Sequence, residues 1–377
     1  MSKVKFGNIA REHKETLKND KSNMAIVGLE HLIPGNIKLI NCDYNKSNTF
    51  KKVFRKGNVL FGRRRAYLKK AAYAEFDGIC SGDITVIEAI PGKISPSLLP
   101  FVVQNDRFFD YAVGKSAGSL SPRVKWEDLK EYEFELPDTI EEQEKIAELL
   151  WSMVDTNDKY KELIIKTDEL VKSQFIELFG DIHENSKDWT MKPLKDLCEI
   201  LNGYAFKSEL YEKQGIRIIR ITNVQKGYVD DSDPQYYPLS YSKELKKYLL
   251  KEEDIVLSLT GNVGRCGLIT KNLLPAGLNQ RVACIRINSN LINKMFLYSF
   301  MKSSIFEQDC IESSKGIAQK NMSTDWLRDY KMFIPPISLQ EEYVKLVKQS
   351  DKSKFELEKC LEELEKTYKR IIFENLG

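Results

Sequence analysis

Basic and aromatic side chains gather in one short segment of this 377-residue chain, FGRRRAYLKKAAY. The segment contains five cations among three aromatic residues, Phe61, Tyr67 and Tyr73. The side chains that we predict to contact DNA are Arg63, Arg64, Arg65, Tyr67, Lys69 and Lys70. Guanidinium groups neutralise phosphates or donate two hydrogen bonds to guanine, and aromatic rings pack on sugars or bases. Together with Arg123 of the SPRVK segment, they predict a nucleic-acid contact, and a solvated basic surface is the alternative.

A second group of polar side chains lies beyond residue 250 and is richer in amides. The segments SLTGNVGRCG, GLNQR and SSKGIAQKN supply Thr260, Asn262, Arg265, Asn279, Gln280, Arg281, Lys315, Lys320 and Asn321. Asn and Gln pair with adenine N6 and N7, and the glycines between them allow close backbone approach. The spacing in GNVGRCG is G-x-x-G-x-x-G, which differs from the dinucleotide-binding motif. We therefore predict a second DNA contact with a different base preference.

Motifs of the enzymes that modify or move along DNA are missing from the sequence. It has no N/D-P-P-Y/F tetrapeptide, no glycine-rich cofactor loop after a strand, and no G-x-x-x-x-G-K-[ST]. Its seven cysteines occur singly and only three histidines are present, so neither a metal site nor a disulfide framework is expected. We predict a non-catalytic chain with no metal and no cofactor of its own.

The apolar runs are too short for a membrane span, and the N-terminal segment lacks the apolar run of a secretory signal. These features predict a cytoplasmic protein without membrane contact.

Charge is unevenly distributed along the chain. The net charge is +3 overall, but 141–180 carries ten acidic and five basic residues, and 338–377 carries nine acidic and eight basic residues. The rest of the chain therefore carries a net charge of +9. This is the distribution expected if the segments outside these two stretches contact phosphate.

An internal repeat organises the chain, and its period is close to 197 residues. Three positions match at an offset of 198, which pairs Leu129, Tyr132 and Pro137 with Leu327, Tyr330 and Pro335. After one gap the offset becomes 197 and holds as far as Phe179-Gly180 and Leu376-Gly377. The repeat predicts two similar halves, each a domain followed by a helix.

The segments 1–136 and 181–334 have mixed α/β character. Short β-rich runs such as 84–87, 216–219 and 282–285 are bounded by Gly, Asn, Asp or Pro, whereas 98–111 and 292–308 have helical patterns.

Charged segments without glycine follow Pro137 and Pro335-Pro336, and each has an apolar stripe at a period of 3.5 residues. The side chains expected to pack between these helices are Ile146, Leu150, Met153, Tyr160, Ile164, Val171, Leu357, Leu361, Leu364, Tyr368 and Ile371. The two stripes keep one heptad phase across the repeat, so we predict two long antiparallel coiled-coil helices. Polar interruptions at Asn157, Ser350 and Lys354 could set the register or contact a partner.

The duplicated helix start and the surrounding architecture resemble the specificity subunits of Type I restriction-modification systems. The motif stands here as Pro137 followed by Glu142-Gln143, whereas the second copy has Pro335-Pro336 followed by Gln340-Glu341-Glu342, with the order of Gln and Glu changed. The segments VGLEHLIPGN and FGRRRAYLKKAAYAEFDGICSGDITV also resemble target-recognition domains of that family.

The resemblance implies an α+β architecture with an internal pseudo-twofold repeat. Its parts would be target-recognition domain 1 (1–136), a central helix (137–180), target-recognition domain 2 (181–334) and a C-terminal helix (335–377). The helices would act as a ruler, so one inserted heptad should lengthen the spacer of the target by about three base pairs.

The resemblance also implies partners. Double-stranded DNA would be bound at a bipartite, asymmetric target, two adenine methyltransferase subunits would dock around the helices, and restriction/translocase subunits would join the complex. S-adenosylmethionine, ATP and Mg would be bound by those partner subunits. Two alternatives stay open, a coiled-coil adaptor that does not bind DNA and the specificity chain of a related system with a different nuclease.

Overall fold

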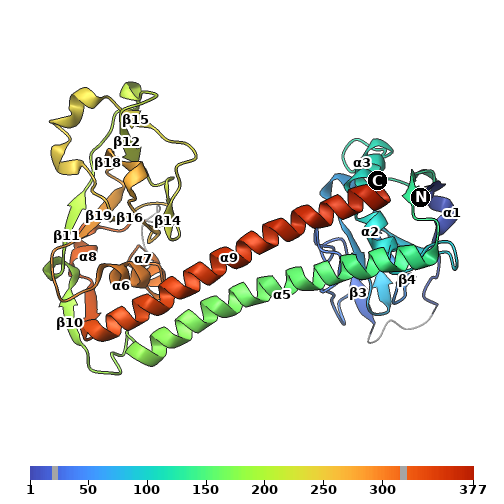
Figure 1. Ribbon diagram of the computed structural model, residues 1–377, viewed down its shortest axis with the longest axis horizontal. Helices are drawn as coiled ribbons and strands as arrows, with labels where there is room; N and C mark the ends of the chain where they lie inside the picture. The colour runs from blue at the N-terminus through green and yellow to red at the C-terminus, as the bar shows by residue number, and fades with distance from the viewer. Residues whose placement is uncertain (19–23, 315–320) are drawn as a thin grey trace. The chain divides into compact units, whose positions relative to one another are not determined.

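The computed structural model describes residues 1–18, 24–314 and 321–377 (Figure 1). The chain divides into two compact units. Unit 1 consists of Met1–Leu163 and Glu356–Gly377, and unit 2 consists of Ile164–Phe355. Each unit is an α/β domain that also contains parts of two long helices, α5 (Ile140–Phe179) and α9 (Ile337–Leu376). No described helix is both long and apolar enough to cross a membrane.

Unit 1 is built around a four-stranded antiparallel sheet and a smaller three-stranded sheet. The larger sheet has the order β2 (Ala10–Glu12), β8 (Ile84–Ala89), β5 (Val59–Gly62), β6 (Ala71–Tyr73). The smaller has the order β3 (Ala25–Val27), β7 (Gly78–Cys80), β4 (Lys52–Phe54), and a separate strand pair joins β1 (Ser2–Lys5) to β9 (Glu133–Leu136). Its helices are α1 (Phe6–Ile9), α2 (Leu99–Val103), α3 (Asp106–Gly114) and α4 (Trp126–Leu129).

Unit 2 repeats this plan. Its larger sheet has the order β11 (Cys198–Asn202), β19 (Val282–Ile287), β16 (Ile255–Ser258), β17 (Cys266–Leu268). The smaller has the order β15 (Tyr236–Tyr237), β12 (Ile216–Ile219), β18 (Ala276–Leu278), and two strand pairs join β10 (Thr190–Pro193) to β20 (Lys331–Ile334) and β13 (Val224–Gln225) to β14 (Tyr228–Val229). Its helices are α6 (Lys294–Met301), α7 (Ser304–Ser313) and α8 (Thr324–Asp329).

The two larger sheets have the same strand order when the strands are matched along the chain. The smaller sheets share one parallel pair, β3 with β7 and β12 with β18, but differ in the third strand. In unit 1 that strand, β4, is added beside β7, whereas in unit 2 β15 is added beside β12. The fold class predicted from the sequence, two α/β domains each followed by a long helix, is confirmed.

The segments expected to form single helices at 98–111 and 292–308 are each broken in two. Asn105 caps α3 by accepting a hydrogen bond from Arg107 N, and Ser303 caps α7 by accepting one from Phe306 N. Both capping residues have extended backbone angles, which end the preceding helix. The apolar pattern continues across each break because both short helices pack on the same core.

Local sequence explains the two long helices. Neither α5 nor α9 contains glycine or proline, and Thr139 and Glu142 form a reciprocal capping box at the start of α5. Pro335 and Pro336 precede α9, where a missing N–H costs nothing. Gly180 ends α5 with a φ of 75°, a conformation that glycine adopts without strain.

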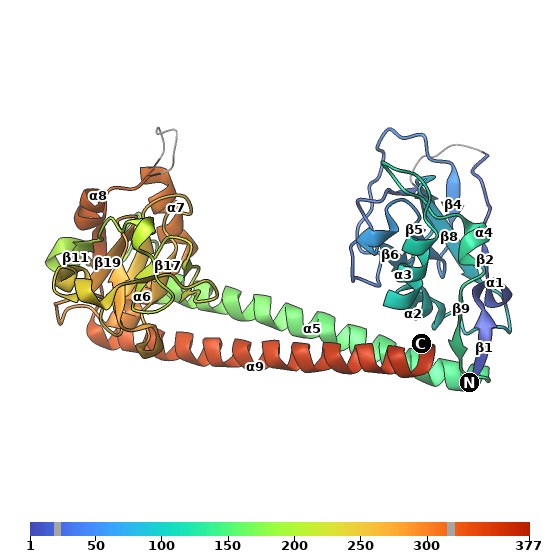
Figure 2. The same ribbon diagram turned by 90° about the horizontal axis from the view of Figure 1, so that it is seen from above.

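The helices pack side by side and antiparallel within each unit (Figure 2). In unit 2 the start of α9 meets the end of α5, where the ring of Tyr343 lies 5.4 Å from that of Phe175 and Lys354 Nζ lies 2.7 Å from Asp168 Oδ1. In unit 1 the rings of Trp151 and Tyr368, one from each helix, both contact Phe101 of α2. Each domain thus packs on the start of one long helix and the end of the other.

A buried glutamine ties the start of each long helix to its domain. Gln143 accepts a hydrogen bond from Ser95 N at 2.8 Å and donates to Pro137 O at 2.8 Å. Gln340 likewise accepts from Asn293 N at 2.7 Å and donates to Pro335 O at 2.8 Å. The two glutamines are 197 residues apart, so the altered order of Gln and Glu in the second motif leaves the structural role in place.

Candidate nucleic-acid interface

The predicted basic segment of the first domain connects β5 to β6. It contains a short 3₁₀ turn at Ala66–Leu68, and Arg65 and Lys69 on either side of that turn have left-handed φ angles of 55° and 51°. Arg65 N donates to Pro122 O at 2.8 Å, and Arg64 and Arg123 form an isolated antiparallel bridge. The fold therefore brings the segment 63–70 next to the SPRVK segment, although they lie far apart in the sequence.

Asp83 holds two of the predicted DNA-binding arginines. Arg123 Nε donates to Asp83 Oδ1 at 2.7 Å, and Arg64 Nη1 donates to Asp83 Oδ2 at 3.4 Å. The side chain of Asp83 is only 22% exposed, and the hydrogen bond from Arg123 is the main cause that holds the pKa of this carboxyl below its ordinary value. Sequence reasoning missed Asp83; its only signal was a lone acid in the turn before a buried strand.

The two lysines of the segment are partly committed to the protein. Lys69 Nζ donates to Asp106 Oδ1 at 2.6 Å, and Lys70 Nζ donates to Leu29 O at 2.7 Å. Arg65 and Tyr67 are exposed, the latter by 54%. Arg63 has a buried Nε that finds no hydrogen-bond partner in the described part of the chain. Arg65 and Tyr67 are therefore the side chains of this predicted set that are most exposed to a ligand.

The predicted amide-rich residues of the second domain lie in connections at the corresponding end of the strands of its larger sheet. Thr260, Asn262 and Arg265 lie in the connection from β16 to β17, and Asn279, Gln280 and Arg281 lie between β18 and β19. Thr260 and Asn321 form an isolated antiparallel bridge. Lys315 and Lys320 lie outside the described residues.

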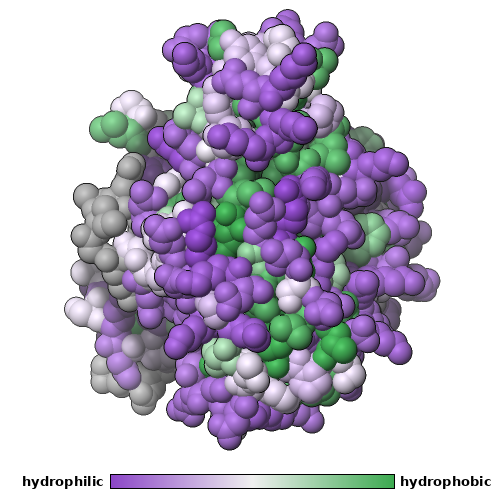
Figure 3. All heavy atoms as spheres, turned by 90° about the vertical axis from the view of Figure 1, so that its left-hand side faces the viewer, coloured by the Kyte–Doolittle hydropathy of each residue, from purple (hydrophilic) through white to green (hydrophobic). Residues whose placement is uncertain are grey.

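Hydrogen bonds hold these connections in place. Asn279 Oδ1 accepts from Arg281 N at 3.1 Å, which fixes the turn before β19, and Arg265 Nη1 donates to Gln225 Oε1 at 2.8 Å. Asn262, Gln280, Arg281 and Asn321 are exposed. Figure 3, which views the left-hand side of Figure 1, shows a face of mainly hydrophilic residues with hydrophobic residues between them.

Two further arginines of unit 2, Arg217 and Arg220, were not anticipated. Their guanidinium groups are largely buried and pair with Asp231 at 2.7 Å and with Asp233 at 3.2 Å. These pairs hold β12 to the segment before β15, which is a structural role.

The predicted helix-packing side chains all lie on the less exposed side of α5 and α9. Leu150 and Met153 are buried, and the remaining nine are half-buried, whereas most of the residues between them are exposed. Of the three polar residues in the stripe, Ser350 is buried, Lys354 pairs with Asp168, and Asn157 is half-buried.

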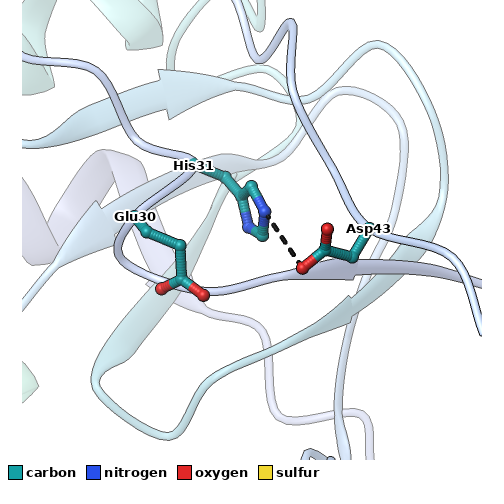
Figure 4. A group of neighbouring side chains, drawn as sticks. All are labelled: Glu30, His31 and Asp43. Carbon is teal, nitrogen blue, oxygen red and sulfur yellow. Dashed lines mark ion pairs between the residues drawn. The ribbon is translucent and has the colours of Figure 1, made fainter. Parts of the chain in front are cut away.

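One cluster has the residue types of a metal site, Glu30, His31 and Asp43 (Figure 4). His31 Nδ1 accepts from Gly28 N at 2.8 Å, and His31 Nε2 lies 3.4 Å from Asp43 Oδ2. The same carboxylate oxygen lies 2.6 Å from Lys46 Nζ, whose hydrogen bond is the main cause that lowers the pKa of Asp43. Two of the three residues, His31 and Asp43, already make contacts that close the loop after β3, which fits a structural role for them better than a cation site.

The seven cysteines are all free thiols. Five of them are buried, and burial raises the pKa of Cys80, Cys198 and Cys266 to about 12. Cys360 on α9 is exposed.

Comparisons with known proteins agree with this architecture. The profile of the Type I restriction modification DNA specificity domain matches residues 12–166 and 186–366, one segment in each half of the repeat. The specificity subunit of the Type I restriction enzyme EcoAI from Escherichia coli is 30% identical over 172 residues, which are 45% of this chain and 28% of that protein. The specificity subunit of MjaVIII from Methanocaldococcus jannaschii is 26% identical over 274 residues, 68% of this chain and 64% of that protein. The chain thus spans about a quarter and just under two thirds of the length of these two relatives.

Solved structures show the same fold. The S subunit of a Type I restriction-modification system from M. genitalium superposes with a TM-score of 0.62 at 15% identity, covering 100% of this chain and 96% of that one. A chain from a study of complex assembly and conformational transition of the type I R-M system gives a TM-score of 0.60 at 17% identity, covering 99% and 97%. Because the family profile matches most of the chain, in the two segments that form the repeat, the protein belongs to the Type I restriction-modification DNA specificity family.

Proposed function

We propose that this protein is the non-catalytic specificity subunit of a Type I restriction-modification complex, in which each domain recognises one half of a bipartite, asymmetric DNA target. One observation carries the proposal. The two larger sheets have identical strand order, and each has exposed cationic or amide side chains at the same end of its strands. The net charge of +9 outside the helices favours contact with phosphate, and the differing side chains favour different bases.

The long helices offer the surface for the methyltransferase subunits. Besides the packed stripe, α5 carries five large apolar side chains that are 47–59% exposed, and these are Leu149, Leu163, Ile165, Leu170 and Ile176. Phe355 on α9 is 64% exposed. A contiguous apolar patch on a protein surface marks an interface, and in this proposal these side chains contribute to one. Two adenine methyltransferase subunits would dock there, and restriction/translocase subunits would join them.

Catalytic chemistry belongs to the partners in this proposal. S-adenosylmethionine would be held by the methyltransferase subunits, and ATP and Mg by the restriction subunits. The complex would act in the cytoplasm, where its DNA substrate lies. This chain would supply the choice of target and the scaffold.

The experiment that tests the proposal is sequencing of methylated adenine in cells that carry this protein with its methyltransferase. We expect one bipartite motif with an unspecified spacer, and no such motif in cells that lack this chain. Methylation without sequence preference would overturn the proposal. Binding of the purified complex to the motif should also weaken steeply with salt, whereas an adaptor that ignores DNA would show no such dependence.

Docking of the methyltransferase has its own test. Phe355→Glu should reduce co-purification of the methyltransferase subunit, because it places a charge in the proposed apolar interface. Ser353→Glu is the matched control, since Ser353 is exposed on the same helix and the substitution adds the same charge. Equal co-purification with both variants would exclude this surface.

A further inference from the structure

Equivalent backbone hydrogen bonds identify corresponding positions in the larger sheets of the two domains. In unit 1 Arg63 N donates to Asp83 O at 3.0 Å, and in unit 2 Leu259 N donates to Arg281 O at 3.0 Å. These bonds match the start of β8 to the start of β19.

A second pair of bonds matches the segment that crosses beside each sheet. Val124 N donates to Arg63 O at 3.0 Å, and Met322 N donates to Leu259 O at 2.8 Å. The isolated bridge between Arg64 and Arg123 then corresponds to that between Thr260 and Asn321.

Three positions are therefore structurally equivalent in the two domains. Two positions face each other across a bridge, and the third immediately precedes the adjacent strand, β8 or β19. In the first domain they are Arg64, Asp83 and Arg123, and in the second Thr260, Arg281 and Asn321. We call each set the three-position site. The backbone hydrogen bonds at these positions are the same in both domains, but the side chains differ at every position.

The side chains of the three-position site have unused hydrogen-bonding capacity. Asp83 engages Nε and Nη2 of Arg123, which leaves Nη1 of that planar guanidinium without a bond to the carboxylate. Arg64 donates from Nη2 to Ser121 Oγ at 3.1 Å, and its buried Nε finds no partner within the described residues. At the equivalent position of the second domain, Thr260 Oγ1 is also buried and without a partner among the described residues.

We propose that the three-position site is the specificity-determining contact of each domain with the base edges of its half-target. Two arginines held by Asp83 favour guanine in the first domain, because their guanidinium groups carry only donors and guanine presents the acceptors O6 and N7. Asn321 and Thr260 can both donate and accept, which suits adenine, and Arg281 suits a neighbouring guanine. Asp83 is a positioning residue that acts through the two arginines.

The two sets have the same formal charge, and this makes the inference testable. Arg64, Asp83 and Arg123 sum to +1, as do Thr260, Arg281 and Asn321. Exchanging them leaves the electrostatic attraction to phosphate unchanged, so that only the recognition of bases should change.

The experiment uses the complete complex with its methyltransferase and a pool of DNA in which both half-targets are randomised. The variant R64T/D83R/R123N should lose about 5- to 150-fold of its preference for guanine in the first half-target. Its preference in the second half-target and its salt dependence should match those of the unchanged protein. Because the inference rests on the proposed function, the unchanged complex is selected in parallel.

The outcomes separate the two proposals. If the unchanged complex selects no sequence, the proposed function fails and the three-position site fails with it. If the unchanged complex selects a motif and the folded triple variant selects the same motif with equal strength, the three-position site alone is overturned.

A second variant covers the case in which the triple variant does not fold. Asp83→Asn keeps the size of the side chain but raises the local charge by one. We expect tighter binding to random DNA together with weaker discrimination in the first half-target. A purely structural role for Asp83 would instead weaken both, and that result would overturn its positioning role.

Discussion

Replacement of Gln340 by leucine tests how the long helix α9 is joined to its domain. The Gln340 side chain is fully buried, and its amide satisfies Asn293 N, Leu291 O and Pro335 O at 2.7, 3.0 and 2.8 Å. Leucine has a similar size but can form none of these bonds. The Pro335 carbonyl lies in a buried bond and should cost about 1–3 kcal/mol when left unpaired. The other two bonds are partly buried and should add about 0.5–1 kcal/mol each.

The expected loss for Gln340→Leu is therefore about 2–5 kcal/mol. Urea unfolding would measure it, and hydrogen exchange of the backbone would locate it. Amides in the first turns of α9 should exchange faster, because that end of the helix is no longer held.

Gln349→Leu is the matched control, since Gln349 is exposed on the same helix and its replacement should change stability by less than about 0.5 kcal/mol. Equal stability and equal exchange in the two variants would refute the role assigned to Gln340. Gln143→Leu should produce the corresponding loss at the start of α5, because it also removes two buried hydrogen bonds.

Three other outcomes are expected. Replacing Arg63, Arg64 and Arg65 together with alanine should weaken DNA binding and flatten its salt dependence while methyltransferase assembly is unchanged; full protection of the half-target in footprinting would contradict this. Exchange of 181–334 for the corresponding domain of a relative should alter one half of the methylated motif and spare the other, and a change in both halves would count against separate recognition. In native protein near pH 8, alkylation followed by mass spectrometry should modify Cys360 well before the five buried thiols, because burial raises their pKa and blocks access; equal rates would show that these cores open easily.

Sequence alone was sufficient for the features that repeat or that extend over many residues. The two long helices follow from forty-residue segments without glycine or proline and from apolar residues at a period of 3.5. The internal repeat follows from matched positions at an offset of 197–198, and the sheet order in both units agrees with it. Such patterns can be recognised in a sequence because they depend on the types and spacing of residues that are near neighbours in the chain.

Breaks within the short helical segments were harder to predict from the sequence. Asn105 and Ser303 each end one helix and cap the next, but the apolar spacing on both sides suggested one continuous helix. A single capping residue changes two backbone angles without changing the pattern of buried side chains, so periodicity does not detect it.

Tertiary structure decided which helix ends belong to which domain. Ile372 and Leu376, close to the C-terminus, lie in the core of unit 1, and Phe175 and Phe179 at the end of α5 lie in the core of unit 2. The sequence shows the basic residues at 61–73 and 121–125. It does not show that Arg64 and Arg123 both bind Asp83, because that contact depends on pairing between segments that are distant in the chain. The sequence determined the chemistry that each segment could offer, because that depends on side-chain type. Only the fold decided which side chains share a site, because long-range pairing in a sheet is set by packing of the whole domain.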